Sequence, residues 1–114
     1  MKVEGAANIP ARAVEVEGAK GVRIRWLITG DDGAENIAMR MFEVEPAGHT
    51  PLHAHSHEHL VFIVEGRGVF VCQDTEYSFD KEHVIFVPGQ IKHQFRNTGD
   101  SVLRFLCIIP AWAS

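Results

Sequence analysis

Four histidines stand at every second position in the middle of the chain, in the run LHAHSHEHLVFIVEG: His53, His55, His57 and His59. Successive side chains of an extended chain point to opposite sides, so residues two apart share a face. This spacing can aim several imidazoles at one point, and imidazole is the commonest metal ligand in proteins. His93 follows in VPGQIKHQFRN, between apolar stretches that can bring it back across a sheet. We therefore expect one bound metal ion, and the function should follow from that site.

The composition excludes several other functions. A chain of 114 residues fits one domain, and its net charge of −4, without a cluster of basic residues, argues against a nucleic-acid partner. The longest apolar runs, such as LVFIV, are too short to span a membrane. The first ten residues lack the apolar core of a secretory signal, so we expect a cytoplasmic protein. In that compartment Cys72 and Cys107 should be buried free thiols.

Short apolar runs separated by Gly, Pro, Asp and Asn predict an all-β domain, either a sandwich or a barrel. Val22 to Thr29 alternates, which places Val22, Ile24, Trp26 and Ile28 on one side. The next strand, Ile37 to Glu45, should stop at Pro46-Ala47-Gly48. Residues 1–20 should form an arm or edge strand, and residues 21–114 the β-barrel domain. The strand Leu60 to Val64 is apolar on both faces, so both faces must be shielded from water. The barrel interior would shield one face and a partner subunit the other, which predicts a homodimer.

The histidine segment resembles the first motif of the cupin superfamily. That motif reads glycine, five residues, His-x-His, three or four residues, Glu, six residues, glycine. Here Gly48 precedes His53 and His55, the Glu position holds His59, and Gly66 ends the motif.

The second cupin motif also has a counterpart. It reads glycine, five residues, Pro, one residue, glycine, two residues, His, three residues, Asn. Pro88, His93 and Asn97 match it, whereas Glu82 and Gln90 replace the two glycines, which should alter the geometry of those turns. The resemblance covers about Pro46 to Asn97 and implies a single-domain jelly-roll (cupin) β-barrel.

The resemblance also implies a ligand set. Cupins usually hold their metal with three histidines and one glutamate, whereas this chain resembles the small single-domain subgroup with four histidines. It implies His53, His55, His59 and His93 as ligands. Glu58 is the alternative carboxylate ligand, but alternation turns it to the other face. His57 should lie at the pocket mouth or in solvent, and His49 and His83 should be surface or capping residues.

Four neutral imidazoles leave a divalent ion with its full charge, which favours an anionic oxygen ligand such as an enolate or a carboxylate. The donor atoms exclude Ca and Mg, and permit Mn, Fe, Co, Ni, Cu or Zn.

Alternation also predicts the lining of the pocket. Glu43, Glu45 and Arg104 should face water, so Arg40, Phe42 and Val44 should face inward, as should Phe95, Phe105, Cys107 and Ile109. An inward arginine beside a cationic metal needs an anion between them. We expect Arg40 to hold an anionic substrate group; a salt bridge at the barrel rim is the competing interpretation.

The resemblance favours a mononuclear metal-dependent dioxygenase that binds a small, enolate-like organic substrate. The alternatives are a metal-dependent isomerase or lyase, with a base among His49, His57 and Glu58, and a small-ligand-binding cupin without catalysis. Fold alone does not decide among these functions.

Overall fold

The computed structural model describes all 114 residues and is all-β, as the sequence predicts. Nine strands follow one another along the chain: β1 (Arg12–Ala13), β2 (Lys20–Ile28), β3 (Ile37–His49), β4 (His59–Glu65), β5 (Gly68–Cys72), β6 (Thr75–Phe79), β7 (Val84–Val87), β8 (His93–Asn97) and β9 (Leu103–Pro110). Three short 3-10 turns complete the fold: η1 (Ala6–Asn8), η2 (Gly30–Asp32) and η3 (Ala111–Ala113). None of these helical segments has the length and apolar character needed to cross a membrane.

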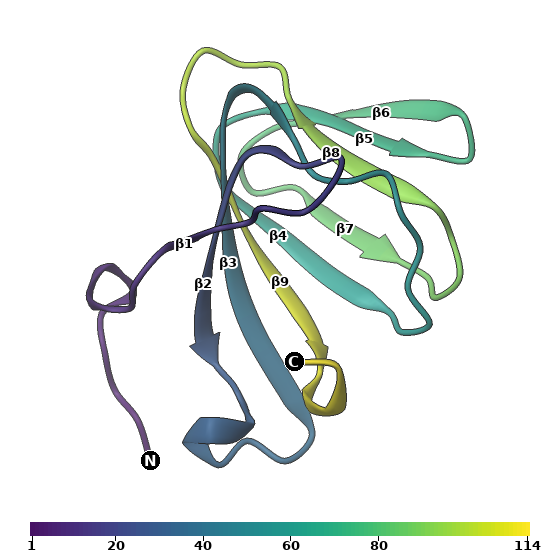
Figure 1. The fold of residues 1–114 in the computed structure, drawn as a ribbon. Helices are drawn as coiled ribbons and strands as arrows, with labels where there is room; N and C mark the ends of the chain where they lie inside the picture. Colours follow the sequence, from purple (N-terminus) through teal and green to yellow (C-terminus); the bar gives the residue numbers. More distant parts are fainter.

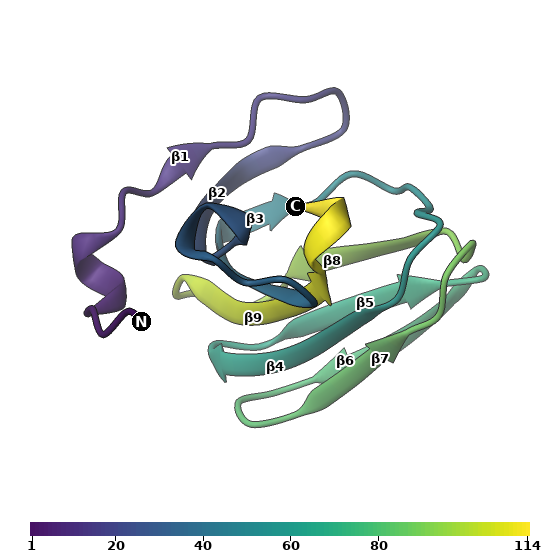
Figure 2. The same cartoon turned by 90° about the horizontal axis from the view of Figure 1, so that it is seen from below.

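The strands pair antiparallel in one sheet with the order β6-β5-β8-β3-β9-β4-β7, and β2 and β1 extend it beside β3. The sheet curls on itself into the single-domain jelly-roll barrel (Figures 1 and 2). Phe105, Cys107 and Ile109 of β9 are buried as predicted, and Leu103 continues the same face. Phe105 stacks on Phe95 of β8 with ring centroids 4.6 Å apart. Cys72 and Cys107 are free thiols as predicted, but only Cys107 is buried, and Cys72 is half-buried.

The predicted alternation of β2 is wrong at its end. Val22 and Ile24 are buried, but Leu27 rather than Ile28 is the next buried residue, and Ile28 is 41% exposed. The pairing of β2 with β3 shifts register between Trp26 and Ile28. An extra residue in one strand of a pair reverses the faces of every side chain beyond it, so simple alternation cannot predict this exchange.

The predicted stop at Pro46-Ala47-Gly48 is also wrong, because β3 continues through these residues to His49. They bend the strand instead: Ala47 has a φ of 66°, and the pairing with β2 shifts register nearby. Gly48 is required at the bend, since a Cβ atom there would lie 2.5 Å from the Lys20 carbonyl oxygen. The pairing of β3 with β9 ends at Val44, and beyond the bend β3 pairs with β8 through His49 and Arg96.

Glu43 was expected to face water but is buried, with 6% of its surface exposed. It lies on the outer face of β3, where the guanidinium groups of Arg23, Arg25 and Arg104 approach its carboxylate at 3.6, 3.4 and 3.1 Å. Long arginine side chains can cover a carboxylate that strand periodicity would leave in solvent. The sequence of β3 alone could not predict that Glu43 is buried, because the arginines that cover it come from the neighbouring strands β2 and β9.

The N-terminal arm is attached through the same ion-pair cluster. Arg25 donates hydrogen bonds to the carbonyl oxygens of Ala6 and Ile9, and β1 pairs antiparallel with β2. The arm therefore runs along the outer edge of β2 (Figure 1) and leads into residues 12–16, which we call the strap.

Candidate metal centre

The histidine segment is a loop between β3 and β4 rather than a continuous strand, and it reaches the site by pairing with β8. His53 and His93 form an isolated antiparallel bridge in which each backbone N–H donates to the other's carbonyl oxygen, at 3.1 and 2.9 Å. Thr50 adds two bonds to Phe95 of β8, one through its backbone N–H and one through its hydroxyl oxygen. The two segments that carry the sequence motifs are thus held together by backbone bonds next to the imidazoles.

The four predicted ligands converge in space. The ring centroids of His53 and His55 lie 4.2 Å apart, and those of His55 and His59, of His59 and His93, and of His53 and His93 lie 5.0, 5.3 and 5.6 Å apart. The Nε2 atoms of His53 and His55 are separated by 3.0 Å. Two imidazole nitrogens bound at about 2.1 Å to one ion with a right angle between them would lie about 3 Å apart, so this pair is already spaced for coordination.

The outer nitrogens of two of these rings have partners that orient them. His93 donates from Nδ1 to the carbonyl oxygen of Ile91 at 2.9 Å, which leaves the lone pair on Nε2. Nδ1 of His59 lies 3.2 Å from Cys107 Sγ and 3.3 Å from an Arg40 nitrogen, whereas its Nε2 is buried and has no hydrogen-bond partner. Metal-ligating histidines usually donate their second N–H to such a partner. A buried Nε2 without a partner fits a metal position, so the residues present fit the ion that the donor set implies.

Burial keeps these imidazoles neutral. It lowers the pKa of His55 to about 4, with further lowering from His53 and His57, and it lowers the pKa of His59 to about 3, with Arg40 as the next cause. The pKa values of His53, His57 and His93 are also lowered, in each case mainly by burial. Protons therefore compete weakly with a cation for these nitrogens near neutral pH.

All four histidines line one cavity of about 430 Å³. Its walls also contain the side chains predicted to face inward: Arg40, Phe42, Phe95, Phe105 and Cys107. The Arg40 guanidinium lies 5.6 Å from the ring centroid of Trp26 and 5.0 Å from that of Phe42, and one of its nitrogens is 2.9 Å from Cys107 Sγ. No ion pair of the chain involves Arg40, and its Nε is buried without a partner. The competing interpretation of a rim salt bridge is therefore not what the structure contains.

The remaining histidines and Glu58 lie outside this cavity. Glu58 is exposed. His83 is exposed and accepts a hydrogen bond from the backbone of Asp80, so it caps a turn, and His49 donates to the Thr50 carbonyl oxygen. His57 is half-buried and packs edge-on against Trp112, with ring centroids 5.5 Å apart.

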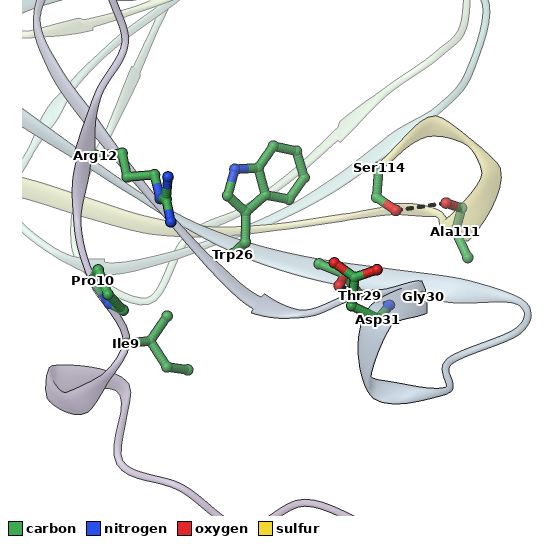
Figure 3. Close-up of a pocket in the computed structure, with 9 residues that line it drawn as sticks. All are labelled: Ile9, Pro10, Arg12, Trp26, Thr29, Gly30, Asp31, Ala111 and Ser114. Atoms are coloured by element: carbon green, nitrogen blue, oxygen red, sulfur yellow. Dashed lines mark hydrogen bonds between the residues drawn. The ribbon is translucent and has the colours of Figure 1, made fainter.

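Sequence reasoning missed the strap. Arg12, Ala13, Val14, Glu15 and Val16 form part of the cavity wall, and Glu15 is the only carboxylate residue that lines it. No local pattern in residues 12–16 predicts this position, which depends on the pairing of β1 with β2. A larger hollow of about 660 Å³ lies beyond Arg12 and Trp26, between the arm, η2 and η3 (Figure 3). It contains none of the histidines, so we place the chemistry in the smaller cavity.

Comparison with known proteins assigns this chain to a protein family. The Cupin domain family matches residues 40–109, which include all four converging histidines. The chain belongs to the cupin family. As a cupin it is 33% identical to the polyketide cyclase RemF from Streptomyces resistomycificus, whose solved structure superposes with a TM-score of 0.91 over 97% of this chain and 80% of that one.

Two further relatives of this chain carry different functions in their names. The chain is 38% identical over 73 residues, 64% of its length, to a 1-methylthio-D-xylulose 5-phosphate methylsulfurylase from Rhodospirillum rubrum. The matched segment makes up 47% of that enzyme, so the chain spans about half the length of this relative. It is 28% identical to the oxalate-binding protein of Thermotoga maritima over 96% of this chain and 93% of that one.

The lowered pKa values predict how the metal-free cupin responds to acid. Between pH 7 and pH 5 the unfolded chain binds protons on histidines that the folded site keeps neutral, so the free energy of unfolding should decrease as the pH falls. The replacement His59→Gln removes one such proton acceptor from the unfolded chain and should make this decrease shallower. Urea unfolding at a series of pH values, with chelator present, measures both slopes. His83→Gln, at an exposed histidine outside the cluster, is the control, and a wild-type stability that is flat over this range would contradict the prediction.

Proposed function

We propose that this cupin is a metal-dependent enzyme that holds one divalent transition metal ion with His53, His55, His59 and His93 and acts on a small anionic or enolate-like organic substrate. One observation carries the proposal: four neutral imidazoles converge in a cavity whose wall contains an arginine without an anionic partner. Buried guanidinium nitrogens without partners are costly, so a wall of this kind suits a ligand that brings an anion.

The residues of the cavity would have separate roles in binding the metal ion, binding the substrate and excluding water. When bound, the ion would act as a Lewis acid toward an oxygen of the substrate. Arg40 would bind and orient an anionic group, held in place by the rings of Trp26 and Phe42. Phe95, Phe105 and the strap would exclude water, which strengthens the attraction between charged groups in the cavity.

A non-redox reaction, such as a cyclisation or an isomerisation through an enolate, is the class that we favour. It is supported by the 33% identity to a polyketide cyclase over nearly the whole chain. Such a reaction needs a group that accepts a proton, and Glu15 of the strap is the only carboxylate at the cavity. Its exposed position would let a proton leave to solvent.

A dioxygenase is the second candidate. The apolar side chains around the histidines, chiefly Phe42, Phe95 and Phe105, give an environment in which O₂ could reach an enolate-like substrate without competing water. The same ligands serve both reactions, so consumption of oxygen distinguishes them.

Metal analysis tests the site. Untagged protein should contain close to one equivalent of Mn, Fe, Co, Ni, Cu or Zn by plasma mass spectrometry, and His59→Ala should lose most of it because Nε2 of His59 is a ligand. His83→Ala is the matched control and should keep its metal. The loaded protein is then incubated with β-diketones and with polyketide-like polycarbonyl compounds in an oxygen electrode. Turnover without oxygen uptake supports the non-redox class, turnover with uptake supports the dioxygenase, and protein without metal or turnover would refute the proposal.

Replacement of Arg40 tests substrate binding separately. Oxalate and acetylacetone, as anionic and enolisable probes, should bind metal-loaded Arg40→Ala roughly 10- to 100-fold more weakly than wild type, the range expected for loss of a hydrogen bond to a charged group. Titration calorimetry measures the affinities, and metal content should stay unchanged. Arg40→Lys should recover part of the affinity because it restores the charge. Equal affinities in wild type and Arg40→Ala would exclude the proposed role.

We also propose that the chain is a homodimer, because the outer face of β4 and β7 is apolar. Leu60, Phe62, Val84 and Phe86 are 51, 41, 76 and 55% exposed and border a shallow hollow lined only by apolar residues. Adjacent exposed apolar side chains of this size are typical of protein interfaces, and closed twofold dimers are the commonest homo-oligomers.

A charge on this face should separate the subunits. Phe62→Lys would desolvate an ammonium group in a dimer contact, so its mass by light scattering should fall to that of one chain at concentrations where wild type gives two. Val3→Lys changes an exposed apolar residue of the N-terminal arm, which does not line this hollow, and should remain a dimer. A wild-type protein with the mass of one chain would refute the dimer.

A further inference from the structure

The histidine cluster is larger than the four-residue ligand set. The ring centroid of His57 lies 5.1 Å from that of His55 and 4.8 Å from that of His59. The ligand nitrogens of His55, His57 and His59 all lie within 4.8 Å of one another, as do those of His53, His55 and His93. Two triads that share His55 are therefore present, and His57 is the one member of either triad that does not line the cavity.

Both triads are compact enough to close on an ion. Imidazole nitrogens bind zinc-like ions at about 2.0–2.1 Å, so nitrogens on opposite sides of one ion are about 4 Å apart. Small rotations of the rings would bring either triad to this spacing. Each imidazole nitrogen has one lone pair, so His55 and His59 can serve only one of the two positions at a time.

His57 is placed at the outer side of the cluster. It is half-buried, does not line the cavity, and its ring is supported edge-on by Trp112, which is itself 72% exposed. The other wall of the cavity is covered by the strap and by apolar side chains. A hydrated cation crosses apolar walls at a high cost, so a route lined by imidazoles is favoured.

We propose that His57 is an exchange ligand: with His55 and His59 it forms an outer metal position through which the ion enters and leaves the inner position of His53, His55, His59 and His93. The inference rests on the proposed metal site. In the transfer, the bond to His57 breaks while the bonds to His53 and His93 form, and His55 and His59 stay bound throughout. All ligands are neutral before and after, so no electron moves and no proton is released.

An exchange ligand has a kinetic signature that a resident ligand lacks. It lowers the barrier between solvent and the inner position, and the same barrier is crossed in both directions. Removing it should therefore slow entry and release by the same factor and leave the equilibrium affinity unchanged. Removing a resident ligand would instead weaken the affinity through faster release.

The test is stopped-flow mixing of Ni²⁺ with metal-free protein, followed by tryptophan fluorescence, and release of Ni²⁺ into excess chelator. In His57→Phe, which keeps a ring against Trp112 but has no ligand nitrogen, entry and release should both slow at least about tenfold, equal to ~1.4 kcal/mol of barrier, with an unchanged Kd. His83→Ala should match wild type. Unchanged rates in His57→Phe, or a weaker Kd with faster release, would overturn the exchange role while leaving the proposed metal site intact. Failure of wild type to bind Ni²⁺ would overturn both.

A second readout locates the ion during entry. The chain has two tryptophans, so Trp26→Phe leaves Trp112, which contacts His57, as the only tryptophan, and excitation at 295 nm avoids Tyr77. Passage through the outer position should quench Trp112 rapidly and then release part of the quenching as the ion moves inward. In the double variant with His57→Phe the rapid phase should vanish. A single quenching phase at the same rate in both proteins would contradict an outer position.

Discussion

The candidate site depends on one pair of backbone hydrogen bonds, those exchanged between His53 and His93. The pair joins a loop that belongs to no strand to the first residue of β8, and it is isolated from the regular ladders. Two residues that exchange both bonds place their side chains on the same face of the pair. The bonds therefore fix two imidazoles from segments 40 residues apart before any ion is present. Bonds between Thr50 of the loop and Phe95, and from Gln90 of the second segment to His55, add to this connection.

The wall opposite this pair is built from an arginine, a thiol and an imidazole. Arg40 contacts Cys107 and approaches Nδ1 of His59, and Cys107 lies against the same nitrogen. Arginine only donates, whereas a thiol sulfur can accept, so Cys107 Sγ can accept from Arg40 and also from Nδ1 of His59 in the tautomer that carries its proton there. In that tautomer the lone pair of His59 is on Nε2, the buried nitrogen that lacks a protein partner. The arrangement also leaves the positive charge of Arg40 beside the candidate metal position, where an anionic ligand would balance it.

The local sequence pattern predicted those parts of the molecule in which strand residues alternate regularly between the interior and solvent. The interior of β9, the convergence of His53, His55, His59 and His93, and the inward position of Arg40 all follow from alternation and motif spacing. Three features do not. Leu27 replaces Ile28 inside because of a register shift, Glu43 is buried by arginines from other strands, and the strap covers the cavity because β1 pairs with β2. Each of these three features depends on contacts between segments far apart in the sequence, so the local sequence around each one could not predict it.

The two missing motif glycines show how strongly the site constrains its turns. Glu82 and Gln90 were expected to alter the turn geometry, but both adopt the left-handed conformation that glycine would take there, with φ values of 67° and 70°. That conformation costs about 1 kcal/mol for a residue with a Cβ atom. Each residue donates its backbone N–H across the fold, Glu82 to Ile63 of β4 and Gln90 to His55 of the histidine loop. The bond from Gln90 holds the backbone of a candidate ligand, so a changed turn would release that ligand from its position. The turn geometry is thus set by the need to hold the histidine loop against β8, and the identity of the residue at the turn is secondary to it.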